Sequence, residues 1–92
     1  MKIQDLLNHE NKWTRYTLAR DSNGKPCKPT SFFAVKWSLV GAIYCCYPTF
    51  SVEKNVRNAI KRWLRLKDEG LQQWNEEHSF VEVRKLVEAL DI

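Results

Sequence analysis

Apolar side chains are concentrated in two neighbouring segments of this 92-residue chain, residues 31–47 and residues 51–67. The first segment is apolar nearly all the way round when it is drawn as a helix, which is typical of a helix in a protein core. We therefore expect a central helix with its N-cap at Ser31 and its end at Pro48. Its large side chains are Phe32, Phe33, Trp37, Leu39, Val40, Ile43 and Tyr44.

One side of this predicted central helix carries only small side chains, which recur three or four residues apart. They are Ala34, Ser38, Gly41 and Cys45. Small residues, and glycine above all, let a neighbouring backbone approach closely. The pattern therefore predicts that another part of the chain packs directly against Gly41.

The second segment, residues 51–67, separates into an apolar half and a basic half. This pattern is typical of a surface helix whose apolar side faces the core. The apolar half comprises Val52, Val56, Ala59, Ile60, Trp63 and Leu66. The basic half comprises Lys54, Arg57, Lys61, Arg62 and Arg65, which span about 140° at roughly 100° per residue. We expect the apolar half to be buried and the basic half to be exposed.

Shorter elements precede these two segments. Residues 2–11 have apolar side chains at helical spacing, and residues 13–20 are rich in the aromatic and β-branched side chains of strands. The dipeptide Asn23-Gly24 favours a tight hairpin turn. The segment after it contains prolines, which restrict it to a short edge strand. We therefore expect a small β-hairpin over residues 17–27.

Near the C-terminus, Ser79 and Glu82 have the spacing of a capping box at the start of a last amphipathic helix. Leu71 and Trp74 indicate a short helical turn before it. Together with the earlier elements, these patterns predict a mainly α, four-helix single domain over residues 1–92. The domain is built around the central apolar helix and includes a small β-hairpin.

Composition and cysteine usage indicate a cytoplasmic protein. The chain is 43% hydrophobic and has three cysteines, an odd number that argues against a disulfide framework. Residues 1–7 lack the pattern of a signal peptide. The apolar run over residues 32–47 is shorter than the ~20 residues that a membrane span needs. We therefore expect a reduced, cytoplasmic protein with no membrane partner.

The sequence shows no reaction chemistry. It contains no phosphate-binding loop, dinucleotide-binding glycine pattern or nucleophile elbow. Its cysteines and histidines lack the spacing of a metal site. Cys45 and Cys46 fall where the apolar pattern predicts burial, which makes a thiol inert. We expect no catalytic residue, metal, cofactor or small-molecule substrate, although a Cys–His pair assembled by folding stays open.

The net charge of +4 is unevenly distributed. Residues 31–70 carry seven Lys and Arg against three acids, whereas residues 71–92 carry two against five. The basic arc of Lys54, Arg57, Lys61, Arg62 and Arg65 is the candidate partner-binding site. A helix face that is exposed to solvent and binds no partner would show the same pattern of charges. If all five residues met phosphates, affinity for nucleic acid would fall about 500-fold between roughly 50 and 200 mM salt.

A helix-turn-helix arrangement is disfavoured. The last helix, which would have to be the recognition helix, begins beside Glu76, Glu77 and Glu82, and phosphates would repel these side chains. The connection before it is also longer than the usual turn of three or four residues. Any contact with nucleic acid would therefore use the basic arc and the phosphate backbone.

Three segments together resemble a family of small phage and bacterial proteins known only as a domain of unknown function. The segments are Trp13 with Ala19-Arg20-Asp21-Ser22-Asn23-Gly24-Lys25-Pro26, then residues 34–42 (AVKWSLVGA), then Trp74-Asn75-Glu76. The family commonly has Cys where this chain has Ser38 and Asp where it has Glu76. The resemblance covers most of the chain from Trp13 onward. It implies a shared fold and a phage or mobile-element setting, and it implies no activity.

We therefore expect a small non-enzymatic binding module, an accessory or inhibitor-type protein that occupies the surface of a macromolecular partner. A protein partner is favoured over a nucleic acid. The alternative is sequence-independent nucleic-acid binding through the basic face of the helix over residues 52–67. An enzyme is the least supported class.

Overall fold

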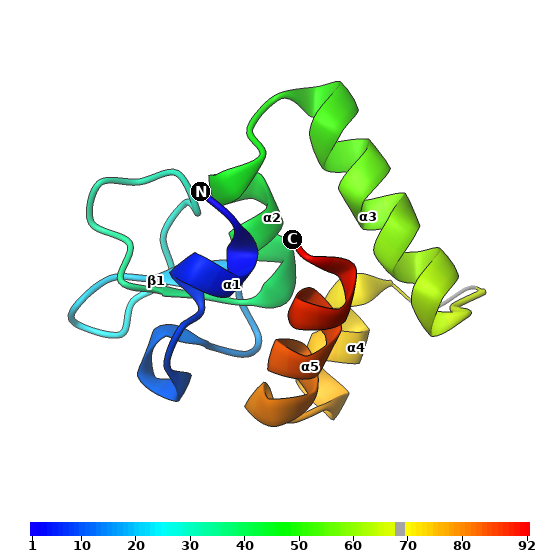
Figure 1. Ribbon diagram of the computed structural model, residues 1–92. Coiled ribbons are helices and arrows are strands. Elements are labelled where there is room, and N and C mark those ends of the chain that lie inside the picture. The colour runs from blue at the N-terminus through cyan, green and yellow to red at the C-terminus, as the bar shows by residue number, and fades with distance from the viewer. Residues whose placement is uncertain (68–69) are drawn as a thin grey trace.

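The computed structural model describes residues 1–67 and 70–92, and in these residues the chain is mainly α-helical with a small antiparallel hairpin (Figure 1). This architecture confirms the predicted fold class. The helices are α1 (Ile3–Leu6), α2 (Leu39–Cys46), α3 (Phe50–Leu64), α4 (Leu71–Glu77) and α5 (Phe80–Leu90). A 3-10 turn, η1, covers Glu10–Lys12, and the strands are β1 (Ala19–Arg20) and β2 (Lys36–Trp37).

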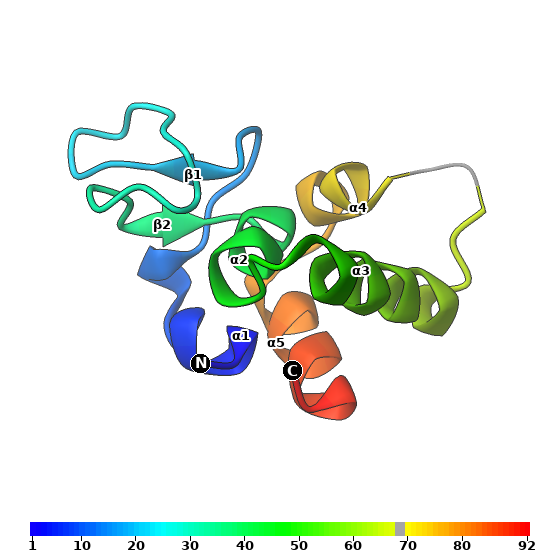
Figure 2. The same cartoon turned by 90° about the horizontal axis from the view of Figure 1, so that it is seen from above.

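Helix α2 lies at the centre of the molecule, with α1, α3, α4 and the hairpin arranged around it (Figure 2). Helix α5 packs against α1, and the two chain ends lie close together. The amide of Gln4 donates to the carbonyl of Ile92, and Lys2 forms an ion pair with Asp91 at 2.6 Å. The fully buried side chains of the core include Ile3, Leu7, Leu39, Ile43, Ile60, Val83 and Val87.

The central helix is shorter than predicted, because it begins at Leu39. Its N-cap is Ser38, whose hydroxyl accepts a hydrogen bond from the amide of Gly41 at 3.0 Å. The proposed N-cap Ser31 instead accepts from the amide of Phe33 in a turn. Residues 36 and 37 pair with β1, which leaves Phe32 and Phe33 outside the helix and the core. A short apolar run fits a strand followed by a helix as well as one long helix.

The hairpin also differs from the prediction in its second strand. The turn at Asp21–Gly24 forms: Gly24 has φ of +80°, and the Asp21 carboxylate accepts from the amides of Asn23 and Lys25. However, β1 pairs with β2, with Ala19 opposite Trp37. The chain after the turn contributes only an isolated bridge between Arg20 and Pro26, because proline has no amide to extend a ladder.

The close approach predicted at Gly41 is confirmed. A Cβ atom at this position would lie 1.8 Å from the carbonyl oxygen of Leu18, which no side chain can tolerate. The hairpin is anchored at the same place, since the amide of Ser38 donates to that carbonyl. The start of α2 and the segment before β1 are therefore packed backbone against backbone.

The capping box at the start of α5 is confirmed as well. The hydroxyl of Ser79 accepts from the amide of Glu82, and the Glu82 carboxylate accepts from the amide of Ser79. The first helix is shorter than the predicted residues 2–11, because α1 ends at Leu6. Arg84 of α5 holds this end by donating to the carbonyls of Gln4 and Leu7.

Candidate functional site

Helix α3 does not bury the side that its sequence predicts. Its buried residues are Glu53 and Ile60, whereas Val52 is 43% exposed, Trp63 is 57% exposed and Ala59 is exposed as well. Measured on a helical wheel, α3 is rotated by roughly 60–70° from the orientation that would bury its apolar half. The predicted burial is therefore wrong for these three residues. We call Val52, Ala59 and Trp63 the outer stripe of α3.

In this orientation α3 buries Glu53, the acidic residue of its first turn. Its side chain is only 3% exposed, and its Oε1 lies 3.2 Å from Nε of Arg57 one turn later. Neither atom makes a hydrogen bond with the described residues, so the contact between them is an ion pair alone. A buried carboxylate needs a compensating charge. Arg57 is therefore committed to Glu53, and it is less available to a partner than the sequence pattern indicated.

The other members of the predicted basic arc are more accessible. Lys54, Arg62 and Arg65 are exposed, and Lys61 is half-buried. Arg65 has φ of +56° and ends the helix, so it lies beyond the helical part of the arc. Glu53 is the one acidic residue of α3, and it is buried. The exposed surface of α3 thus carries positive charge without a carboxylate.

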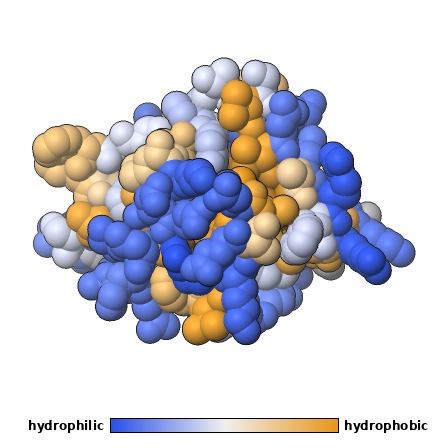
Figure 3. Space-filling view, in the orientation of Figure 1, coloured by the Kyte–Doolittle hydropathy of each residue, from blue (hydrophilic) through white to orange (hydrophobic). Residues whose placement is uncertain are grey.

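The outer stripe and the charged residues lie side by side on α3. Figure 3 shows apolar side chains along the edge of α3 that faces the rest of the molecule and hydrophilic side chains along its other edge. The exposure of the outer stripe itself follows from the individual residues, since Val52, Ala59 and Trp63 are all exposed. Tryptophan and arginine are the residues most enriched among energetically dominant positions of protein interfaces. The combination of Trp63 with Arg62 therefore has the chemistry of a protein-binding surface.

A groove of about 360 Å³ opens where α3 approaches α4 and α5. Its apolar lining comes from three elements, which is why no sequence pattern revealed it. The lining residues are Trp63 and Leu64 of α3, Trp74 of α4, and Leu86 and Ala89 of α5, together with the charged Glu82 and Lys85. The outer stripe of α3 leads into this groove at Trp63.

A second apolar surface lies on the loop between β1 and β2. Phe32 is 96% exposed and Phe33 is 71% exposed, with their rings edge to face at 5.7 Å. The sequence pattern placed both in the core, and the pairing of β2 with β1 moved them out. Backbone hydrogen bonds form turns in this loop over residues 28–34. None of the described loop residues lines the groove between α3, α4 and α5.

The Trp-Asn-Glu segment has a structural role. Asn75 is fully buried, and its side-chain oxygen accepts from the indole of Trp13 at 2.8 Å and from the amide of Leu39 at 2.9 Å. Its side-chain nitrogen donates to the carbonyl of Thr14 at 3.1 Å. Asn75 therefore joins α4, the start of α2 and the segment after η1.

Glu76 continues the same network. Its carboxylate accepts from the amide of Tyr16 at 2.8 Å and from the side chain of Gln72 at 2.9 Å. Tyr16 has a positive φ of 69°, an uncommon conformation for a residue with a side chain. The ring of Tyr16 is 75% exposed. Glu76 thus holds a strained backbone position in place.

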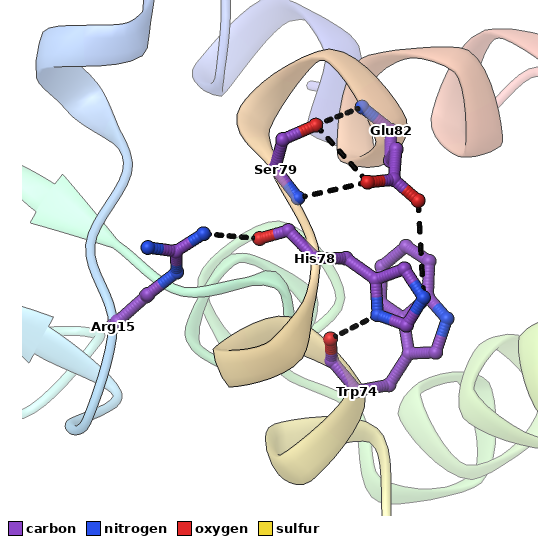
Figure 4. A network of polar contacts seen from close by, with 5 residues as sticks. All are labelled: Arg15, Trp74, His78, Ser79 and Glu82. Atoms are coloured by element: carbon purple, nitrogen blue, oxygen red, sulfur yellow. Dashed lines mark hydrogen bonds and ion pairs between the residues drawn. The ribbon is translucent and has the colours of Figure 1, made fainter.

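His78, Ser79 and Glu82 lie together but are not arranged for nucleophilic catalysis (Figure 4). The hydroxyl of Ser79 donates to Glu82, and His78 Nδ1 donates to the carbonyl of Trp74 at 2.7 Å. The second ring nitrogen of His78 lies 3.8 Å from Glu82. In a catalytic serine–histidine pair, the serine hydroxyl donates a hydrogen bond to the histidine ring. The cluster instead joins α4 to α5, with Arg15 donating to the carbonyl of His78.

The cysteines are free thiols. Desolvation raises the pKa of Cys45, and it raises the pKa of Cys46 to about 11. The sequence pattern placed both residues in the core, whereas each is half-buried. The raised pKa lowers the thiolate fraction of both residues at neutral pH. Across residues 1–67 and 70–92, no three His, Cys, Asp or Glu side chains gather into a group that would bind a metal ion. No helix within the same residues is long and apolar enough to span a bilayer.

No protein-family model, curated protein or solved structure matches this chain. The family resemblance seen in the sequence therefore stays a prediction.

Proposed function

We propose that this protein is a non-enzymatic binding module that acts by occupying a macromolecular partner's surface, and that α3 is its working face. The observation that carries the proposal is the orientation of α3. The helix turns Val52 and Trp63 outward while it buries Glu53, the only acid among its residues. Burying the apolar stripe against a partner would recover about 25 cal/mol for each Å² removed from water.

An acidic protein is the favoured partner. Lys54, Arg62 and Arg65 supply positive charge for attraction at a distance, which speeds association and falls with salt. Trp63 supplies an apolar side chain, and a charged phosphate backbone offers no apolar surface against which it could be buried. The family resemblance adds a phage or mobile-element setting, in which an accessory or inhibitor-type protein would block a surface of another protein.

Co-purification from the native host tests this proposal. Tagged wild-type protein is compared with Trp63→Ala, with the double variant Lys54→Glu/Arg62→Glu, and with Phe32→Ala. The last variant is a matched control, because it removes an exposed aromatic ring from the other apolar surface. We expect the same protein with wild type and Phe32→Ala, and its loss with the α3 variants. Equal recovery with every variant, or loss with Phe32→Ala alone, would contradict the proposal.

Sequence-independent nucleic-acid binding is the second candidate, and the single-sign exposed charge of α3 is the observation that favours it. Binding of a labelled random-sequence oligonucleotide is measured at about 50 and 200 mM salt. The second candidate predicts binding that Lys54→Glu/Arg62→Glu abolishes, that Trp63→Ala leaves intact and that collapses at the higher salt. Absence of binding at the lower salt rejects it.

A further inference from the structure

The groove beside Trp63 defines the shape of a partner segment more closely than the charge of α3 does. It lies between helices α3 and α5, with Trp74 contributed by α4, and its apolar lining includes Leu86 and Ala89. A cleft between two helices that is lined in this way accepts the apolar side of a third helix. The exposed outer stripe extends the apolar surface from the groove along α3 to Val52.

We propose that this groove and the outer stripe bind an acidic amphipathic helix of the partner protein. The inference rests on the proposed function and specifies the occupant of the same face. Val52 and Trp63 are eleven positions apart, which corresponds to about 16 Å at roughly 1.5 Å per residue. That length matches an apolar ridge of three helical turns.

The charges around the groove favour an acidic occupant. Lys85 of α5 lines the groove and is exposed, and the groove's carboxylate belongs to Glu82. Arg62 is exposed on α3 next to Trp63 of the outer stripe. Glu82 is already engaged, since it accepts hydrogen bonds from Ser79 and lies 3.8 Å from His78. Among the described residues that line the groove or flank the outer stripe, Lys85 and Arg62 are exposed and positively charged, so acidic residues beside the apolar ridge would be attracted.

A second copy of this chain is a poorer occupant. Its helix α5 carries two acids and two bases, with Glu82 in the capping box and Glu88 paired with Arg84. Asp91, at the end of that helix, is paired with Lys2. A second copy would have to break these contacts to present an acidic side to the groove.

A display library of helices of about 14 residues tests the occupant directly. Apolar residues are fixed along one side, and the other positions are drawn from Glu, Lys, Gln and Ala. We expect selection on wild-type protein to enrich helices with net negative charge. One enriched peptide is then synthesised, and its affinity should fall about tenfold or more with Trp63→Ala but stay unchanged with Phe32→Ala.

Charge reversal gives the second readout. The variant Arg62→Glu/Lys85→Glu should lose the acidic peptide and bind the same peptide with its Glu residues replaced by Lys. Failure of any helix to enrich, enrichment without a charge bias, or equal affinity for Trp63→Ala would overturn the inference. Dimerisation that Trp63→Ala abolishes would also overturn it, because a second copy would fill the groove. In any of these cases, the proposed function stands if the partner still co-purifies with wild-type protein and is lost with the α3 variants. Only the proposal that the partner segment is an acidic helix is then rejected.

Discussion

Helices α2 and α3 follow one another in the chain, and both carry enough apolar residues for a core helix. The first five residues of α2, Leu39 through Ile43, are all buried. In the fifteen residues of α3, only Glu53 and Ile60 are buried. One helix is enclosed by the fold, whereas the other lies along its side with an apolar stripe outside.

The difference lies in how each helix is held. The start of α2 is fixed by three independent contacts: the Ser38 cap, the side chain of Asn75 on the amide of Leu39, and the backbone of Leu18 against Gly41. Helix α3 has no side-chain hydrogen bond at its N-cap Thr49, and its main neighbour is α2. Apolar periodicity therefore shows which helix faces are suited to burial, while specific polar and backbone contacts decide which faces are buried.

The largest expected effect comes from enlarging a small residue. Gly41→Leu should destabilise the fold by about 3 kcal/mol or more, because its side chain would overlap the backbone of Leu18. The matched change on α3 is Ala59→Leu, which adds an exposed side chain and should alter stability by less than about 0.5 kcal/mol. Urea unfolding measures both. Equal urea midpoints for the two variants would contradict the claim that α2 is enclosed by the fold while this side of α3 is exposed.

Charge reversal on α3 separates its inner from its outer side. Arg57→Glu places a second carboxylate beside buried Glu53 and should cost about 3 kcal/mol, the low end for a broken buried pair because Arg57 is partly exposed. Lys54→Glu makes the same change at an exposed position and should stay within about 0.5 kcal/mol. Thermal unfolding followed by circular dichroism compares them. If Arg57→Glu is as harmless as Lys54→Glu, Glu53 is not buried.

The two N-caps give a smaller contrast. Ser38→Ala removes the bond to the amide of Gly41 and a bond to Gln72, and we expect a loss of about 1–2 kcal/mol. Thr49→Ala removes no capping bond and should be close to neutral. Chemical unfolding of the two variants in parallel is sufficient. A larger loss for Thr49→Ala would mean that α3 is the better anchored helix.

The smallest effect is a gain. Arg65 ends α3 in the left-handed conformation that glycine adopts most easily, so Arg65→Gly should stabilise by about 0.5–1 kcal/mol. Asp91→Gly at the end of α5 is the control. Asp91 has φ of 54° but also pairs with Lys2, so glycine there should gain less. A shift in melting temperature reports both, and a loss with Arg65→Gly would indicate that the arginine side chain stabilises the helix end.

Local signals in the sequence were sufficient for much of the fold. The spacing of Ser79 and Glu82 predicted the start of α5, and the small residues around Gly41 predicted a close backbone contact. Both depend on neighbours along the chain or on one helix face. The start of α2 was missed because the strand pairing of Trp37 with Ala19 joins residues far apart in sequence.

The sequence predicted only the basic residues of the candidate site. The residues of the basic arc were identified from spacing, but the pairing of Arg57 with a buried Glu53 depends on how α3 docks. The groove is formed by three helices, and no local pattern encodes it. The exposure of Trp63 has the same origin, since the amphipathic pattern alone would have buried it.

Solvent exposure of Trp63 is the most direct test of the central claim, that α3 turns part of its apolar side outward. The four tryptophans are labelled with 5-fluorotryptophan, and their fluorine resonances are compared in H₂O and D₂O, with Trp63→Phe providing the assignment. We predict the largest solvent isotope shift for Trp63, which is 57% exposed, and a much smaller one for Trp74, which is 8% exposed. A Trp63 resonance as protected as that of Trp74 would mean that α3 buries its apolar side, and α3 would then lack the proposed binding surface.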